Sequence, residues 1–129
     1  MFLICLLLFL IPQYRNLKCS NPHRQTLTLN HIDAKDKKLL TDVLMERGKL
    51  LSAKGQHEES EDVFQQALEN YRAVDFDLGE LGALNALGII AKRQGKYVVA
   101  INHLEQATKL LNDTSPPDRI ASIYTNLSN

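Results

Sequence analysis

The chain has 129 residues, with 15 Lys and Arg against 15 Asp and Glu, so its formal charge at neutral pH is zero. Modules that bind nucleic acid concentrate excess positive charge on one face, and this balance therefore argues against a nucleic-acid partner. Charged residues at 23% and hydrophobic residues at 44% are typical of a globular protein and argue against wholesale disorder.

The N-terminus begins with an apolar run over residues 2–11. It is shorter than the roughly 20 apolar residues of a transmembrane helix, but it suits the central region of a signal peptide. Arg15 and Lys18 follow the run and no basic residue precedes it, the reverse of the usual signal order. We expect residues 1–19 to be a hydrophobic leader, either a signal peptide or an anchor that attaches to a membrane through residues 2–11. The alternative is a mis-assigned start codon.

This leader decides the expected location of the protein. A genuine leader implies export or membrane attachment on the periplasmic or extracellular side, whereas a spurious one implies a cytoplasmic protein. The two cysteines are Cys5 and Cys19. Because Cys5 lies inside the leader, the mature chain would keep at most one thiol, which excludes a disulfide framework. Residues 20–33 are polar and aperiodic, and we expect a linker there.

Beyond the linker the apolar residues recur with helical spacing, in five successive segments. Asp33 can cap the first helix, and a turn at Gly55-Gln56 precedes the second. Asp77 and Glu80 have the spacing of a capping box at the start of a third helix. A turn at Gly95-Lys96 leads to the fourth. A Ser115-Pro116-Pro117 sequence supplies a cap and an N-terminal proline for a fifth, which reaches Asn129.

The apolar residues of the first four predicted helices recur as the stripe of a one-sided helix. They are Leu40, Val43, Leu44, Leu50 and Leu51 in the first and Val63, Phe64, Ala67, Leu68 and Tyr71 in the second. The third carries Leu81, Leu84, Leu87 and Ile90, and the fourth carries Val98, Ala100, Ile101, Leu104, Ala107 and Leu111.

A shift of 40 residues superimposes the first two helices on the next two. Identical residues meet at five positions: Leu44/Leu84, Gly48/Gly88, Gly55/Gly95, Gln66/Gln106 and Ala67/Ala107. Hydrophobic or small residues also meet at Leu50/Ile90, Phe64/Leu104 and Ser60/Ala100. Two coincident glycines are hard to obtain by chance in a chain with only six. The sequence therefore contains an internal repeat of helix pairs.

These residues resemble the tetratricopeptide repeat family, whose pattern combines Leu-Gly in the first helix with small and aromatic positions in the second. The first copy reads Leu44, Gly48, Leu51, Gly55, Ser60, Phe64 and Ala67. The second reads Leu84, Leu87-Gly88, Ala91, Gly95, Tyr97, Ala100, Leu104 and Ala107. A third copy begins at Tyr124, Leu127 and Ser128.

The sequence departs from the family pattern at three positions. Arg47 stands where the pattern has Leu, and Arg72 and Asn112 stand where it has Pro. Loss of that Pro allows longer helices and so accounts for a period of 40 residues. Periods of this length look like those of bacterial sensor and regulator proteins.

The resemblance implies an all-α fold, an antiparallel helix-hairpin solenoid over residues 34–129 with two full repeats and the first helix of a third. Gly48 and Gly88 would let the helices of each pair approach closely, and Ala67 and Ala107 would do so between pairs. Because stacked neighbours must cover each pair, and about three repeats are the usual minimum, we expect a truncated, N-terminal piece of a longer array.

The sequence shows no clear motif for catalysis, for phosphate binding or for metal binding. The four histidines lack the spacing of a metal site, and no phosphate loop or nucleophile elbow is present. We expect no enzyme activity, no catalytic residues, no cofactor and no metal in these residues.

The remaining candidate for a functional site is the concave groove. In a repeat array of this kind, the first helix of each pair lines that groove. By register, Asp42, Met45, Lys49 and Ser52 face it from the first copy, and Gly82, Asn85, Ile89, Lys92 and Arg93 from the second. Asn85 is the strongest single candidate, since its amide can hold the backbone of an extended peptide. The mixture of apolar and basic side chains indicates an amphipathic peptide or helix as partner.

We therefore expect a non-enzymatic protein–protein interaction scaffold that binds a protein or peptide, as the N-terminal sensor or docking part of a longer signalling protein. One alternative is the regulatory segment of a kinase, cyclase-like or DNA-binding regulator whose output domain lies beyond residue 129. The other is a small structural protein that self-associates through its open C-terminal end.

Overall fold

The computed structural model describes residues 33–129. The predicted leader, both cysteines and the predicted linker as far as residue 32 lie outside the described residues. The described part forms five helices: α3 (Ala34–Ala53), α4 (His57–Ala73), α5 (Asp77–Arg93), α6 (Tyr97–Leu110) and α7 (Pro117–Ser128). None of these five combines the length and apolar character needed to cross a membrane.

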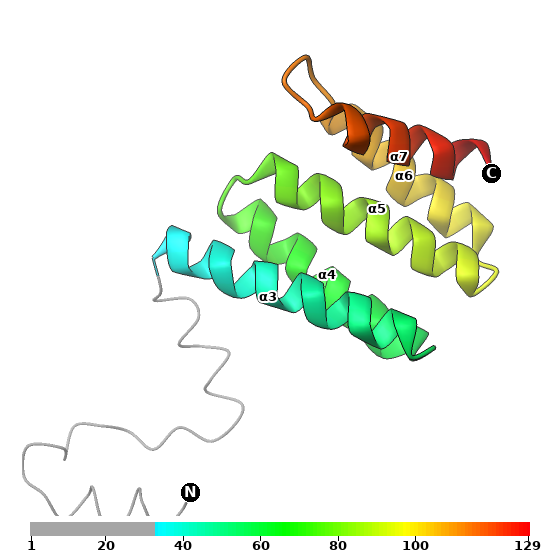
Figure 1. The fold of residues 1–129 in the computed structure, drawn as a ribbon, viewed down its shortest axis with the longest axis horizontal. Helices are drawn as coiled ribbons and strands as arrows, with labels where there is room; N and C mark the ends of the chain where they lie inside the picture. The colour runs from blue at the N-terminus through cyan, green and yellow to red at the C-terminus, as the bar shows by residue number, and fades with distance from the viewer. Residues whose placement is uncertain (1–32) are drawn as a thin grey trace, which may run out of the picture. The chain divides into compact units, whose positions relative to one another are not determined.

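The helices form consecutive antiparallel hairpins, α3–α4 and α5–α6, and α7 follows as the first helix of a third (Figure 1). Each helix packs on the next in the chain, and α5 also contacts both α3 and α7. The first helices of the hairpins, α3, α5 and α7, therefore lie next to one another, with α4 and α6 behind them. This arrangement confirms the all-α helix-hairpin solenoid expected from the repeat.

Both glycine turns lie where the repeat predicts them. Gly55 and Gly95 have φ angles of 80° and 76°, in the left-handed region that side chains with a Cβ rarely adopt. The turn between the hairpins instead uses a residue with a side chain there, Asp75, at φ 51°.

Two predicted helix caps are wrong by one residue. Phe76, not Asp77, caps α5, because the Phe76 carbonyl accepts the backbone N–H of Glu80 at 3.0 Å. Pro116 caps α7 in place of Ser115, whose hydroxyl accepts the backbone N–H of Asn112 at 3.0 Å. Asp33 occupies the cap position of α3 as expected, although its side chain makes no capping hydrogen bond.

Because glycine has no Cβ, Gly48 and Gly88 let the two helices of each hairpin come close together. A Cβ added at Gly48 would lie 2.5 Å from Cε1 of Phe64, and one at Gly88 would lie 2.7 Å from Cγ of Leu104. These are the pairs that the 40-residue shift superimposes. In the first hairpin the buried Ser60 hydroxyl also donates to the Gly48 carbonyl at 2.8 Å. The prediction of close helix approach at both glycines is confirmed.

The core runs through the stack and does not stop at a hairpin boundary. Phe64, Ala67, Leu68 and Tyr71 of α4 pack with Leu81, Leu84, Leu87 and Ile90 of α5, with Ala107 of α6 and with Ile123 of α7. Ala67 and Ala107 are fully buried. Burial of apolar surface between hairpins is therefore as much a part of the fold as burial within them.

We expect Gly48→Ala to lower the free energy of unfolding by about 1–3 kcal/mol, since the added methyl overpacks the Phe64 ring by more than the helix propensity of alanine restores. Urea unfolding followed by circular dichroism measures the change. Phe64→Leu serves as the partner substitution. The double variant should lose less than the sum of the two single losses, and strict additivity would show that the ring is not what Gly48 accommodates.

Candidate ligand-binding groove

A groove of about 570 Å³ lies along the facing sides of α3 and α5. α3 contributes Lys38, Asp42, Met45, Glu46, Lys49 and Ser52 to its lining, and α5 contributes Leu78, Gly82, Asn85, Ala86, Ile89 and Arg93. The lining also includes Phe64 and Tyr71 of α4, Phe76 before α5 and Arg119 of α7. Both hairpins and α7 thus contribute to one surface.

The structure brings most of the predicted groove residues together. Eight of the nine line this groove, and six of these eight are Asp42, Met45, Lys49, Asn85, Ile89 and Arg93. Ser52 and Gly82, which the register also placed there, line it as well. That these residues contact a ligand stays a prediction.

Lys92 does not line the groove. Its ammonium group donates to the backbone carbonyl of Asn126 in α7 at 2.8 Å. Because successive residues of a helix are rotated by about 100°, the neighbour of Arg93 points toward the adjacent helix and not into the groove. Lys92 therefore holds α7 in place.

Asn85 uses both ends of its amide to hold α7. Its Nδ2 donates to Oγ of Ser122 at 3.0 Å, and its Oδ1 accepts from Nδ2 of Asn126 at 2.8 Å. The amide was predicted to hold a peptide backbone, but these two bonds already satisfy one donor and one acceptor. Asn85 therefore lines the groove and at the same time binds α7.

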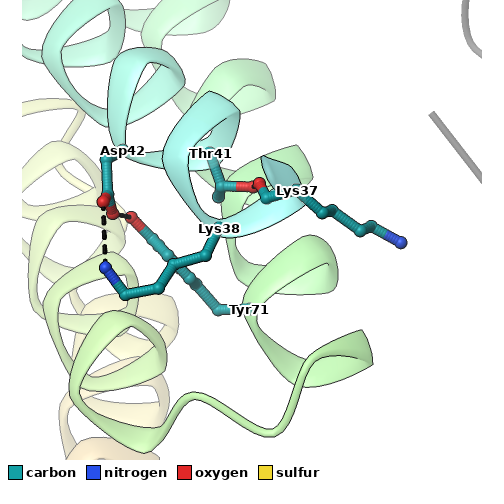
Figure 2. A network of polar contacts seen from close by, with 5 residues as sticks. All are labelled: Lys37, Lys38, Thr41, Asp42 and Tyr71. Carbon is teal, nitrogen blue, oxygen red and sulfur yellow. Dashed lines mark hydrogen bonds and ion pairs between the residues drawn. The ribbon is translucent and has the colours of Figure 1, made fainter. Parts of the chain in front are cut away.

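A network of polar contacts joins three residues that line the groove, Lys38, Asp42 and Tyr71 (Figure 2). The buried Tyr71 hydroxyl donates to Oδ1 of Asp42 at 2.5 Å, and Nζ of Lys38 lies 3.1 Å from Oδ2 of the same carboxylate. Lys38 also lies 4.5 Å from the centre of the Phe76 ring. The network ties α3 to the end of α4 and satisfies the Asp42 carboxylate internally.

Burial and the neighbouring carboxylates raise the pKa of Tyr71 above its ordinary value of 10.0. Burial of the hydroxyl is the largest cause, and the hydrogen bond to Asp42 and the negative charges of Asp42 and Glu46 add to it, while the Arg119 guanidinium acts in the opposite direction. A phenol with a raised pKa stays protonated and keeps donating to Asp42. Tyr71 is therefore a structural donor in this fold.

Sequence reasoning missed several lining residues, among them Lys38, Glu46, Phe76 and Arg119. Lys38 continues the stripe of Asp42, Met45 and Lys49 backward by one helical turn, so extending the register would have found it. Arg119 comes from the third hairpin, and nothing in the sequence shows which way its side chain turns.

The histidines that the structure describes are His57 and His103. Within residues 33–129, no group of three or more His, Cys, Asp or Glu side chains could hold a metal ion. Burial lowers the pKa of His103, which is half-buried behind the groove on α6.

Stacked helical hairpins with a shared groove define the class of helical repeat proteins. The family model described as tetratricopeptide repeat matches residues 40–113, more than half of the chain, and the protein belongs to this family. Searches of curated proteins and of solved structures found no match. Members of the family generally mediate protein–protein interactions and are typically non-enzymatic.

We expect Tyr71→Phe to lower the free energy of unfolding by about 1–2 kcal/mol, because the Asp42 carboxylate loses a buried donor but remains partly open to water. Chemical unfolding at pH 7 measures this loss. Above pH 10 the unfolded chain ionises Tyr71 while the folded chain keeps it protonated, so wild-type stability falls as the pH rises. The variant should lose this part of the pH dependence, and identical slopes between pH 9.5 and 11 would contradict the assignment.

Proposed function

We propose that the protein is a non-enzymatic scaffold that binds a protein or peptide in the groove between α3 and α5. The observation that supports this most is the composition of the groove wall, where half-buried Met45 and Ile89 alternate with charged side chains. Apolar anchors beside polar groups are the usual composition of a peptide-binding surface. The family to which the chain belongs acts in this way in general.

The finer parts of the proposal rest on the sequence. The 40-residue period supports a role as the sensor or docking part of a longer signalling protein. The apolar run at residues 2–11 supports attachment to a membrane or export, and it lies outside the described residues. Neither part is needed for binding in the groove.

A second candidate is self-association. Leu39, Val43 and Leu50 of α3 are 64%, 62% and 64% exposed, and their spacing places them on one side of the helix. On α6, Val98 and Ile101 are 82% and 48% exposed. Exposed apolar residues on both α3 and α6 fit association of copies through these two helices.

The groove is tested by placing a photo-cross-linking amino acid at residue 89 in cells that make the protein, with position 98 on α6 as the control. We expect cross-links to a defined partner from position 89 only. In binding assays with that partner, Ile89→Glu should weaken affinity at least tenfold, because a carboxylate replaces a partly buried apolar contact. The matched exposed change Val98→Glu should leave affinity within twofold, and equal losses would refute the groove.

Self-association is tested by sedimentation velocity of the full chain over a wide concentration range. Val43→Glu should shift the protein toward the monomer if the exposed face of α3 forms the contact, because a charge cannot be buried there without a partner. Glu46→Gln, on the groove side of the same helix, should not. A monomer at all concentrations would remove this candidate and leave the scaffold proposal unaffected.

A further inference from the structure

The charges in the groove lining do not cancel. Four basic side chains, Lys38, Lys49, Arg93 and Arg119, face two acidic ones, Asp42 and Glu46, which leaves a difference of 4 − 2 = 2 positive charges. The acidic groups are compensated, since Asp42 lies 3.1 Å from the ammonium of Lys38 and Glu46 lies 2.6 Å from that of Lys49. The excess positive charge therefore belongs to the two arginines.

These arginines keep donors available for a ligand. Among the described residues, neither Arg93 nor Arg119 forms an ion pair. Arg93 donates once, from Nη1 to Oγ of Ser52 at 2.6 Å, which fixes its direction across the groove without neutralising it. Both side chains are exposed, and a guanidinium has five N–H donors that match a carboxylate in a bidentate fork.

The two guanidinium groups lie toward opposite ends of the same wall. Nη1 of Arg119 is 3.0 Å from the position of a Cβ on Gly82, so the guanidinium lies over that residue. Arg93 follows Gly82 on α5 by 93 − 82 = 11 residues. Eleven residues of α-helix rise roughly 16 Å and turn about three times, so both positions face the groove. Half-buried Ile89 lies between them along α5, and half-buried Met45 of α3 also lines the groove.

The groove offers little to the backbone of an extended peptide. Asn85 already bonds to α7 through both ends of its amide, and Asp42 already accepts from Tyr71 and Lys38. Asn85 and Asp42 therefore have little hydrogen-bonding capacity left for the backbone of an extended ligand, whereas a helix satisfies its own backbone groups. In a helical ligand, residues eleven apart also share one face and the same spacing as the two arginines.

We propose that the groove binds an amphipathic helix of a partner protein that presents two carboxylates eleven residues apart. One carboxylate pairs with Arg119 and the other with Arg93, and the apolar side chains between them pack on Ile89 and Met45. The proposal rests on the groove being the binding site, and it adds the conformation and charge of the ligand.

The test uses helix-stabilised synthetic peptides of 18 residues and fluorescence anisotropy with the full chain. The acidic peptide carries glutamate at its fourth and fifteenth positions and leucine at the eighth, eleventh and twelfth. The basic peptide replaces both glutamates with lysine, and a third peptide moves one glutamate by two positions. We expect the acidic peptide to bind at least tenfold more tightly than either control, with affinity that weakens as salt rises.

The protein variants locate the contacts. Arg93→Glu with Arg119→Glu should weaken the acidic peptide at least tenfold and should strengthen the basic one. Arg47→Glu is the matched control, because Arg47 is an exposed arginine of α3 that does not line the groove. It should change the affinity less than twofold, and circular dichroism confirms that each variant is folded.

Three outcomes would overturn the inference: equal binding of all three peptides, equal losses for the control and the double variant, or no binding of the acidic peptide. Cross-linking from position 89 separates this failure from failure of the scaffold itself. Suppose that a partner is captured at position 89 and is lost with Ile89→Glu, but the acidic peptide does not bind. This result would refute the acidic-helix ligand and would leave the groove as the binding site. Absence of both would refute both.

Discussion

The close approach of the two helices within each hairpin is the constraint on which the remaining structure depends. Gly48 admits the ring of Phe64, and Gly88 admits the side chain of Leu104, at distances that no Cβ could tolerate. With this approach fixed, the second helix of one hairpin lies flat against the next and buries Ala67 there. The first helices are then brought side by side, and their facing surfaces form the groove.

α5 shows how one helix serves several neighbours. Leu84, Leu87 and Ile90 are buried in the shared core, Gly88 accommodates α6, and Asn85 and Lys92 hold α7. Because α5 packs against several neighbours, it has no single polar face, and apolar residues occur around much of the helix. The groove is the part of α5 that no neighbouring helix covers.

The repeat made the fold predictable from sequence, because positions 40 residues apart had to satisfy the same packing twice. The glycine turns and the helix order followed from it, and so did eight of the nine predicted groove residues. Cap positions were less predictable, since Phe76 contributes a backbone carbonyl and not a side-chain signal. The roles of Asn85 and Lys92 could not be foreseen, because they depend on how α7 docks and on which of two available surfaces each side chain meets.

Arg119 couples the groove to α7, which the residues of α3 and α5 alone would not do. It reaches the groove from α7, which the Asn85 amide and the Lys92 ammonium hold in place. Any ligand that contacts this guanidinium binds the docked form of α7 better than an undocked form. By thermodynamic linkage, occupancy of the groove and docking of α7 must then favour each other by the same free energy. The extent to which α7 is docked would therefore increase when a ligand binds.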